Sequence, residues 1–101
     1  LENILLTEVG HLKLADFDLS KVVVGKTYTT CGTPTSFAPE VLTGEGHTLA
    51  VDWWTLGILI FEVMSWESPF DGDSPMQIYQ RVMCGIDKVD FPPACRGPVA
   101  E

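Results

Sequence analysis

Residues 52–66 read DWWTLGILIFEVMSW, and their apolar side chains surround nearly the whole circumference of a helix. A helix with this pattern is enclosed by other structure, whereas a surface helix shows one apolar stripe and one polar face. We therefore expect these residues to form the central helix of the fold. The rest of the chain offers too little material to cover every face of this helix, so we expect its partners to lie outside the chain.

A second helix is expected after the first, beginning near Ser74. A serine can cap a helix, Pro75 suits the first helical position, and Gln77 stands where a capping box has a glutamine. Gly85 can end this helix, because glycine readily adopts the left-handed conformation that follows many helix C-termini. The residues 74–85 therefore contain both a start and a stop signal.

A β-hairpin is expected before the central helix. Short apolar runs at 4–6 and 12–14 are separated by a polar stretch with Gly10 near the tip, which is typical hairpin spacing. The segment 20–48 is rich in glycine, proline and threonine and resists regular structure. A long loop in a compact domain is usually functional, so we expect this segment to carry part of a site.

The composition is that of a globular protein and restricts its partners. Hydrophobic residues make up 46% of the 101 residues and charged residues 20%, which argues against intrinsic disorder. Because 14 acidic residues stand against 6 basic residues, the formal charge at pH 7 is −8. No basic stripe is available for nucleic acid or anionic lipid, so we expect no nucleic acid and no membrane partner, and cationic partners fit better.

The cysteines predict a reducing compartment. Cys31, Cys84 and Cys95 are widely spaced and form no Cys-x-x-Cys pair, so they indicate neither a disulfide framework nor a zinc site.

The apolar run 53–64 is shorter than the roughly 18 to 20 residues that a bilayer needs. We therefore expect a cytoplasmic protein without a membrane span, and the start at Leu1 predicts a piece of a longer chain.

Five short motifs, read in order, resemble those of a protein kinase. They are Leu1–Leu6, Ala15–Asp18, Cys31–Pro34, Ala38–Glu40 and Val51–Trp54. They are similar to the end of the catalytic loop, the magnesium-binding Asp-Phe-Gly motif, the activation segment with its Ala-Pro-Glu end, and the central helix of the large lobe. Each motif alone is weak, but chance does not readily place all of them at kinase intervals.

The resemblance narrows to one group of kinases. Cys31–Pro34 and Asp52–Trp54 are similar to the AGC serine/threonine group. Gly85–Asp87 with Phe91–Pro92 is similar to its cyclic-nucleotide-dependent members, especially the cGMP-dependent branch. The resemblance implies an α+β, protein-kinase-like fold in which residues 1–101 form part of the large, mainly helical lobe, with a small β-hairpin, the activation segment and two helices.

The resemblance also implies a function and two cofactors. Such a kinase transfers the γ-phosphoryl group of ATP to serine or threonine of protein substrates, with Mg²⁺ neutralising the phosphates. The chain lacks a glycine-rich loop, the phosphate-anchoring lysine and the catalytic aspartate, so we expect it to be inactive in isolation. The alternative is a truncated or pseudokinase-like module that binds a protein without catalysis.

Asn3 and Asp16 are the magnesium ligands that the resemblance implies. Magnesium needs hard oxygen donors beside the nucleotide phosphates, and a hairpin can bring an amide and a carboxylate 13 positions apart to one edge. The alternative for Asn3 is a residue that only caps a turn.

The resemblance puts Leu5 under the adenine and Ala15 at the border of that pocket, where the alternative is ordinary hairpin core. Thr33, the third candidate catalytic residue, corresponds to a threonine near the catalytic aspartate.

Thr29 matches the activation-loop phosphorylation site of the family, and Lys21 matches a residue that helps to hold the phosphate. A phosphate adds roughly −1.5 to −2 of charge and can order a loop through charge-assisted hydrogen bonds. The resemblance therefore implies an upstream activating kinase that acts on Thr29. The alternative is that Thr29 and its neighbours are solvated loop threonines.

Two acidic residues are expected to recognise the substrate. Glu2 and Glu62 fall where basophilic AGC kinases face an arginine shortly before the phosphorylated residue, and paired carboxylates suit the guanidinium fork. The alternative for Glu62 is a carboxylate paired within the protein, because a buried unpaired charge is costly. Thr30, Pro34 and Phe37 fall where the family shapes the pocket for the residue after the acceptor. We therefore expect protein substrates with basic residues near the acceptor serine or threonine.

One departure from the family pattern stands in the magnesium-binding motif. Asp18 occupies the position of a glycine, whose permissive backbone lets the segment move. Aspartate tolerates left-handed geometry better than most residues, so its backbone penalty is small. Phototropin-like kinases of plants and algae carry the same Asp-Phe-Asp sequence and are active. We therefore expect Asp18 to change activity only modestly.

Overall fold

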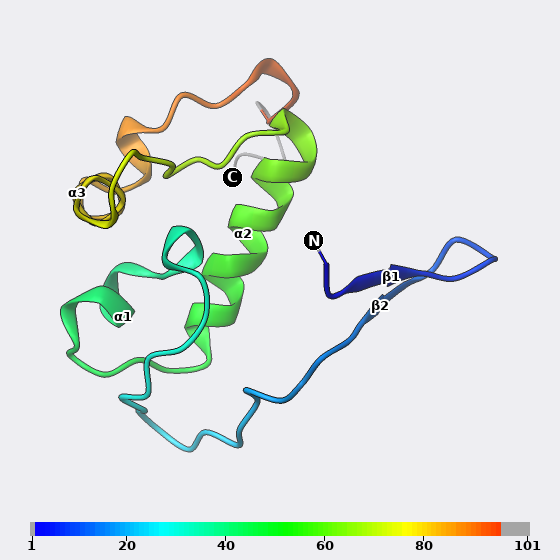
Figure 1. Ribbon diagram of the computed structural model, residues 1–101, viewed down its shortest axis with the longest axis horizontal. Helices are drawn as coiled ribbons and strands as arrows, with labels where there is room; N and C mark the ends of the chain where they lie inside the picture. Colours follow the sequence, from blue (N-terminus) through cyan, green and yellow to red (C-terminus); the bar gives the residue numbers. More distant parts are fainter. Residues whose placement is uncertain (1, 96–101) are drawn as a thin grey trace.

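A long central helix runs through the molecule, with short elements on one side and a projecting hairpin on the other (Figure 1). The structure, a computed structural model, describes residues 2–95, so Leu1 of the first motif lies outside it. In chain order the elements are β1 (Ile4–Leu6), β2 (Leu12–Leu14), the 3-10 helix η1 (Pro34–Ser36), α1 (Pro39–Thr43), α2 (Ala50–Ser65), α3 (Pro75–Met83), and the 3-10 helices η2 (Ile86–Lys88) and η3 (Pro93–Cys95). The mixed α+β class is confirmed.

Helix α2 is the predicted central helix and begins two residues earlier than expected. It ends where Trp66 adopts the left-handed conformation, with φ 62°, and donates its N–H to the Glu62 carbonyl oxygen at 2.8 Å. Ile58 and Phe61 are buried, whereas Trp53 is 74% exposed. The described residues therefore leave apolar surface of this helix uncovered. None of the helices within residues 2–95 has the length and apolar character needed to cross a bilayer.

A small core lies between α2 and the segment that follows it. Its buried residues are Ile58 from α2, Phe70 from the next loop and Val82 from α3. Partly buried apolar side chains surround it: Leu42, Trp54, Ile78 and Val89. The ring of Trp54 stacks on that of Phe70, with centroids 5.5 Å apart and planes at 13°. Because each fully buried apolar side chain contributes about 1.5–3 kcal/mol, this cluster is what holds α3 against α2.

Helix α3 has the start and the stop that the sequence predicts. The Ser74 hydroxyl oxygen accepts a hydrogen bond from the Gln77 backbone N–H at 3.3 Å. The Gln77 side-chain oxygen accepts from the Asp73 backbone N–H at 2.9 Å, one residue before the position expected of a capping box. At the other end, Gly85 directly follows the C-cap with a φ of 79° and a ψ of 178°, a backbone conformation that glycine adopts far more readily than other residues.

The segment 20–48 is not wholly irregular, which corrects the expectation from its composition. It contains η1 and α1, which begin at Pro34 and Pro39. Proline favours a first helical position because its φ is already near the helical value and the N–H that it lacks would be unpaired there. Helix α1 stops at Gly44, whose φ is 70°. These helices are too short to show hydrophobic periodicity in the sequence.

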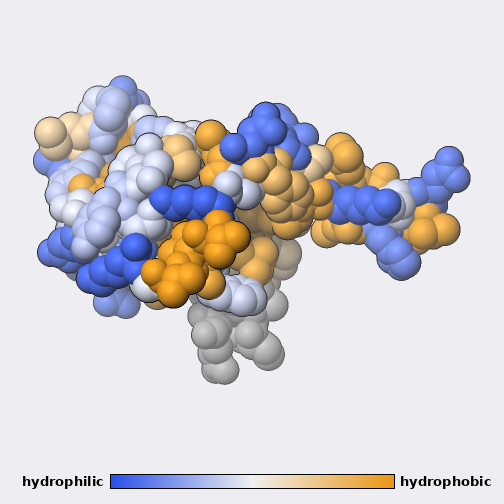
Figure 2. Space-filling model, turned by 90° about the horizontal axis from the view of Figure 1, so that it is seen from below, coloured by the Kyte–Doolittle hydropathy of each residue, from blue (hydrophilic) through white to orange (hydrophobic). Residues whose placement is uncertain are grey.

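The predicted hairpin stands apart from the helices, and Figure 2 shows it as a largely apolar arm with polar groups at its tip. Its strands are antiparallel, with Ile4 opposite Leu14. At the turn, Gly10 has a φ of 89° and donates its N–H to the Thr7 carbonyl oxygen at 2.9 Å. Four leucines are more than half exposed: Leu5, Leu6, Leu12 and Leu14. Because an isolated two-stranded hairpin is marginally stable, this arm needs an apolar surface from elsewhere.

Truncation of Val82 tests how much the core contributes, since this side chain is fully buried. We expect Val82→Ala to lower the free energy of unfolding by about 2 kcal/mol, because it removes two buried methyl groups and leaves a cavity. Val22 is 94% exposed, so the matched change Val22→Ala should stay within about 0.5 kcal/mol. Urea denaturation followed by tryptophan fluorescence measures both values. Equal losses in the two variants would contradict this assignment of the core.

Candidate functional site

The base of the hairpin brings Asn3 and Asp16 to the same end of the ribbon. The Ala15 N–H donates to the Asn3 carbonyl oxygen at 2.9 Å, which continues the ladder beyond the first strand pair. Asp16 follows directly and has a φ of 63°. This left-handed conformation is less costly for aspartate than for most residues, because its short side chain can form local hydrogen bonds. Both side chains are exposed, so an amide oxygen and a carboxylate are available at one edge.

These two oxygen donors suit Mg²⁺ when it is bound together with a nucleotide. Mg²⁺ takes octahedral oxygen coordination and usually combines one or two carboxylates with phosphate oxygens and water. Across residues 2–95 no three His, Cys, Asp or Glu side chains gather as a metal cage would require. Asn3 and Asp16 therefore fit a metal whose other ligands are phosphates and water.

The candidate adenine contacts, Leu5 and Ala15, belong to the same ribbon. Leu5 pairs with Lys13 and is 53% exposed. Ala15 directly follows β2 and is half-buried. Both apolar side chains are therefore open to a ligand or to another part of a larger domain.

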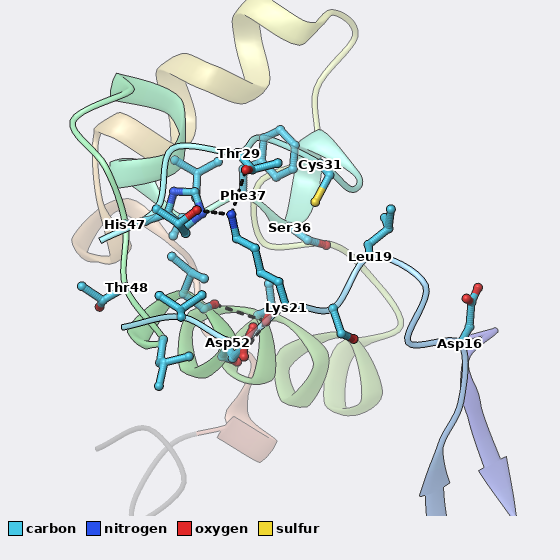
Figure 3. Close-up of a pocket in the computed structure, with 18 residues that line it drawn as sticks. Asp16, Leu19, Lys21, Thr29, Cys31, Ser36, Phe37, His47, Thr48 and Asp52 are labelled. Atoms are coloured by element: carbon cyan, nitrogen blue, oxygen red, sulfur yellow. Dashed lines mark hydrogen bonds between the residues drawn. The ribbon is translucent and has the colours of Figure 1, made fainter. Parts of the chain in front are cut away.

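A cavity of about 380 Å³ lies between the segment 19–41 and the start of α2 (Figure 3). The Lys21 ammonium reaches into it and donates hydrogen bonds to the hydroxyl oxygens of Thr27 and Thr29, the latter at 2.8 Å. Asp16 also lines this cavity, on the side next to the hairpin, and Figure 3 shows it well away from Thr29. The structure thus brings together Lys21 and Thr29, the pair that the kinase resemblance links to phosphorylation.

The residues expected to contact the position after the acceptor lie along η1 and on either side of it. Thr30 and Pro34 are exposed, whereas Phe37 is half-buried and lines the cavity described above. Gly32 has a φ of 112°, and a Cβ there would lie 3.5 Å from the Phe37 ring. Thr33 directly precedes η1, and its hydroxyl makes no capping hydrogen bond. The Thr33 hydroxyl is therefore available to another group.

The two candidate arginine-binding carboxylates come from different elements. Glu62 is half-buried on α2, and its carboxylate has no ion-pair partner in the part of the chain that the structure describes. Glu2 is exposed just before β1, where a hydrogen bond from its own backbone N–H lowers the pKa of its carboxyl. Both groups can therefore accept hydrogen bonds from a guanidinium.

One contact in this region was not indicated by the sequence. Thr27 and His47 exchange two backbone hydrogen bonds, each with an N···O distance of 2.8 Å. Beside this bridge, a Cβ on Gly46 would lie 2.7 Å from the ring of Tyr28. The glycines near His47 are a sign of close approach, but a single sequence does not reveal which distant residue approaches them.

Comparison with known proteins decides the family. The family described as "Protein kinase domain" matches residues 1–95. This chain belongs to the protein kinase family. Over 91 residues it is 55% identical to the cAMP-dependent protein kinase catalytic subunit PRKX of Homo sapiens, a match that covers 90% of this chain and 25% of that protein. The chain thus spans about a quarter of the length of this relative.

Two further relatives have names of cyclic-nucleotide-dependent kinases. Identity is 50% over 92 residues to the cAMP-dependent protein kinase catalytic subunit of Arthrobotrys oligospora, covering 90% of this chain and 17% of the relative. Identity is 45% over 93 residues to the cGMP-dependent protein kinase, isozyme 2 forms cD5/T2, of Drosophila melanogaster. This match covers 90% of this chain and 10% of the relative. The chain is a segment of an AGC-type kinase catalytic domain. Among these three relatives, the chain is more identical to the two cAMP-dependent kinases than to the cGMP-dependent kinase. The sequence motifs had favoured the cGMP-dependent branch.

Lys21 links Thr27 and Thr29 to the cavity, so removal of its ammonium should loosen the segment around them. We expect Lys21→Met to increase amide hydrogen exchange in residues 26–31, because two side-chain hydrogen bonds are lost. The matched control is Lys13→Met on β2, which should leave exchange in this segment unchanged. Hydrogen exchange followed by peptide mass spectrometry measures both variants. If exchange in the segment were the same in both, Lys21 would not be ordering it.

Proposed function

We propose that this chain is part of a serine/threonine protein kinase that transfers the γ-phosphoryl group of ATP to proteins. The family assignment supports this proposal, and one structural observation carries it. The hydrogen bond between Ala15 and Asn3 joins the two strand ends that bear the amide of Asn3 and the carboxylate of Asp16. In this role both residues hold Mg²⁺, which when bound neutralises charge on the transferring phosphates.

The remaining nucleotide and catalytic contacts follow from the same arrangement. In this proposal Leu5 and Ala15 contact the adenine ring, and their accessible apolar side chains suit that role. Thr33 contributes a hydroxyl near the catalytic aspartate of the complete domain, and its lack of a capping hydrogen bond is compatible with this. The chain therefore supplies metal ligands and one side of the nucleotide pocket.

The proposed substrates carry basic residues near the acceptor serine or threonine. Glu2 and Glu62 bind an arginine that precedes the acceptor, and the half-buried Glu62 gains a partner that it lacks within residues 2–95. Thr30, Pro34 and Phe37 contact the residue after the acceptor, with Phe37 giving this pocket an apolar wall. The formal charge of −8 agrees with cationic substrates.

Phosphorylation of Thr29 by an upstream kinase regulates the enzyme in this proposal. Lys21 already donates to the Thr29 hydroxyl oxygen at 2.8 Å, so it stands ready to pair with a phosphate there. A phosphate would turn a hydrogen bond between an ammonium and a neutral hydroxyl into one between two opposite charges, which is stronger. Lys21 would therefore hold the modified segment more tightly than the unmodified one.

We also propose a cytoplasmic location for the kinase. All three cysteines are free in the structure: Cys31 and Cys84 are exposed and Cys95 is buried. Exposed free thiols are typical of proteins in a reducing compartment.

The isolated chain should not catalyse transfer, because it contains neither a glycine-rich phosphate loop nor the phosphate-anchoring lysine of a kinase. The alternative function is a protein-binding module without catalysis. The exposed apolar surface of α2, with Trp53 at 74% exposure, favours the binding of some partner. The same surface suits the rest of a kinase lobe, and the family assignment makes this the preferred interpretation.

Substitution of Asp16 tests the proposed transfer directly in the full-length protein. We expect Asp16→Asn to lower kcat by at least about two orders of magnitude, because the metal loses its charged ligand and several kcal/mol of transition-state stabilisation. The control Asp18→Gly changes a neighbouring aspartate and should alter activity only modestly. Phosphate transfer from radiolabelled ATP to a basic serine peptide measures the rates. If the unchanged full-length protein transferred no phosphate, the non-catalytic alternative would replace this proposal.

Recognition of arginine by Glu62 has a separate test. We expect Glu62→Gln to raise KM about tenfold for a peptide with arginine before the acceptor, because the guanidinium loses the negative charge of its acceptor and keeps only a neutral amide oxygen. KM for the same peptide with alanine in that position should not change. Glu67→Gln, at an exposed carboxylate just after α2, is the matched control and should leave both values unchanged. An equal rise in KM for both peptides would argue against arginine recognition.

A further inference from the structure

His47 lies directly opposite Thr27 in the isolated antiparallel bridge that joins the activation segment to the loop before α2. Residues opposite one another in an antiparallel pair project their side chains from the same face. In an extended chain every second residue shares a face, which assigns Thr29 to the face of Thr27. In agreement, Thr27, Thr29 and His47 all line the cavity of Figure 3, whereas Tyr28 does not.

This arrangement brings an imidazole within reach of a phosphate on Thr29. Side chains directly opposite one another have Cβ atoms about 4.5–5.5 Å apart, and diagonal neighbours about 7–8 Å apart. The isolated bridge pairs Thr27 with His47, and Thr29 stands two residues beyond Thr27, in the diagonal position. A phosphate on the Thr29 hydroxyl and the ring of His47 are together long enough to meet across the separation of two diagonal Cβ atoms. Figure 3 shows the His47 ring on the same side of the cavity as the Lys21 ammonium.

Within the part of the chain that the structure describes, Lys21 brings one positive charge to a phosphate that carries more than one negative charge. A phosphothreonine carries roughly −1.5 to −2 of charge and presents three strong acceptor oxygens. Among the residues that line the cavity, the titratable groups are Asp16, Lys21, Cys31, His47 and Asp52. Of these Lys21 alone has a permanent positive charge. The nearby ammonium of Lys26 is used elsewhere, since it donates to the Glu45 carbonyl oxygen at 3.4 Å.

We infer that His47 is a second ligand of the phosphate on Thr29 and donates a ring N–H to a phosphate oxygen that Lys21 does not use. The inference rests on the proposed function, in which Thr29 is phosphorylated. With this contact, the phosphate links the activation segment to the loop before α2 through side chains as well as through the Thr27 bridge. Modification of Thr29 thereby holds the segment more tightly to the loop before α2.

The test uses the full-length protein with Thr29 phosphorylated, as checked by mass spectrometry. We compare the rate at which a broad-specificity phosphatase removes the phosphate from the unchanged protein and from His47→Leu. We expect removal to be about tenfold faster in the variant, because one charge-assisted hydrogen bond to the phosphate is lost. The matched control is His11→Leu at the tip of the hairpin, which should behave like the unchanged protein.

A rescue variant separates a phosphate ligand from a merely structural residue. His47→Lys restores a donor and should return phosphate removal to near the original rate, whereas a packing role would not be rescued. The backbone bridge to Thr27 does not need the imidazole, so the melting temperatures of the unphosphorylated variants should agree. Equal removal rates in the unchanged protein and His47→Leu overturn the inference, as does a Thr29 that no kinase phosphorylates.

A parallel assay of phosphate transfer to a basic peptide separates this inference from the proposed function. If the unchanged protein transfers phosphate to the peptide while His47→Leu loses the Thr29 phosphate at the original rate, only the inference fails. If the protein transfers none and Thr29 is nevertheless protected by His47, the proposed catalysis fails and the phosphate site stands.

Discussion

The stacking of Trp54 on Phe70 holds the loop after α2 back against the helix from which it comes. With Ile58 and the fully buried Val82, these rings form a cluster that joins α2 to α3. Because apolar burial is the main favourable term in folding, the placement of α3 and of the loop after α2 depends on this cluster. Other apolar side chains of α2 are not covered by the described residues, and Trp53 is mostly exposed, so the helix is suited to a larger packing arrangement.

Residues 21–31 of the activation segment are held in a different way, by a few polar contacts, and none of them is buried. Lys21 reaches two threonine hydroxyls, and one bridge joins Thr27 to His47. Between these contacts Val22 and Val24 are more than 90% exposed. Segments with few buried apolar contacts open at low free energy. A single added charge can therefore change the order of this segment while the core around α2 stays as it is.

The sequence predicted those parts of the fold that depend on local signals. Helix α3 follows from the cap at Ser74 and the stop at Gly85, and the hairpin follows from its spacing around Gly10. Helix α1 was missed, because five residues beginning at Pro39 do not form a periodic pattern. The bridge between Thr27 and His47 joins residues 20 positions apart, and nothing local to either residue signals it.

The candidate site likewise contains residues that the sequence indicated and one residue that only the fold reveals. Motif resemblance picked out Lys21 and Thr29, and the structure brings them to hydrogen-bonding distance. Asn3 and Asp16 come to one edge through the ladder of a hairpin that the sequence indicates. His47 was missed because its place depends on tertiary pairing, and a histidine in a glycine-rich loop has no distinguishing pattern. Resemblance thus identifies residues that belong to a family's motifs, whereas a residue placed by tertiary pairing is found only from the fold.

The close approach of Gly46 to Tyr28 has a consequence for how this chain can vary. A Cβ at position 46 would lie 2.7 Å from the tyrosine ring, and the φ of 83° there already favours glycine. The two positions share one small space, so the volume at one sets the volume allowed at the other. A smaller residue at position 28 would remove the clash but not the backbone strain that any side chain meets at this φ. The loop can therefore tolerate a change at position 28 more easily than one at position 46.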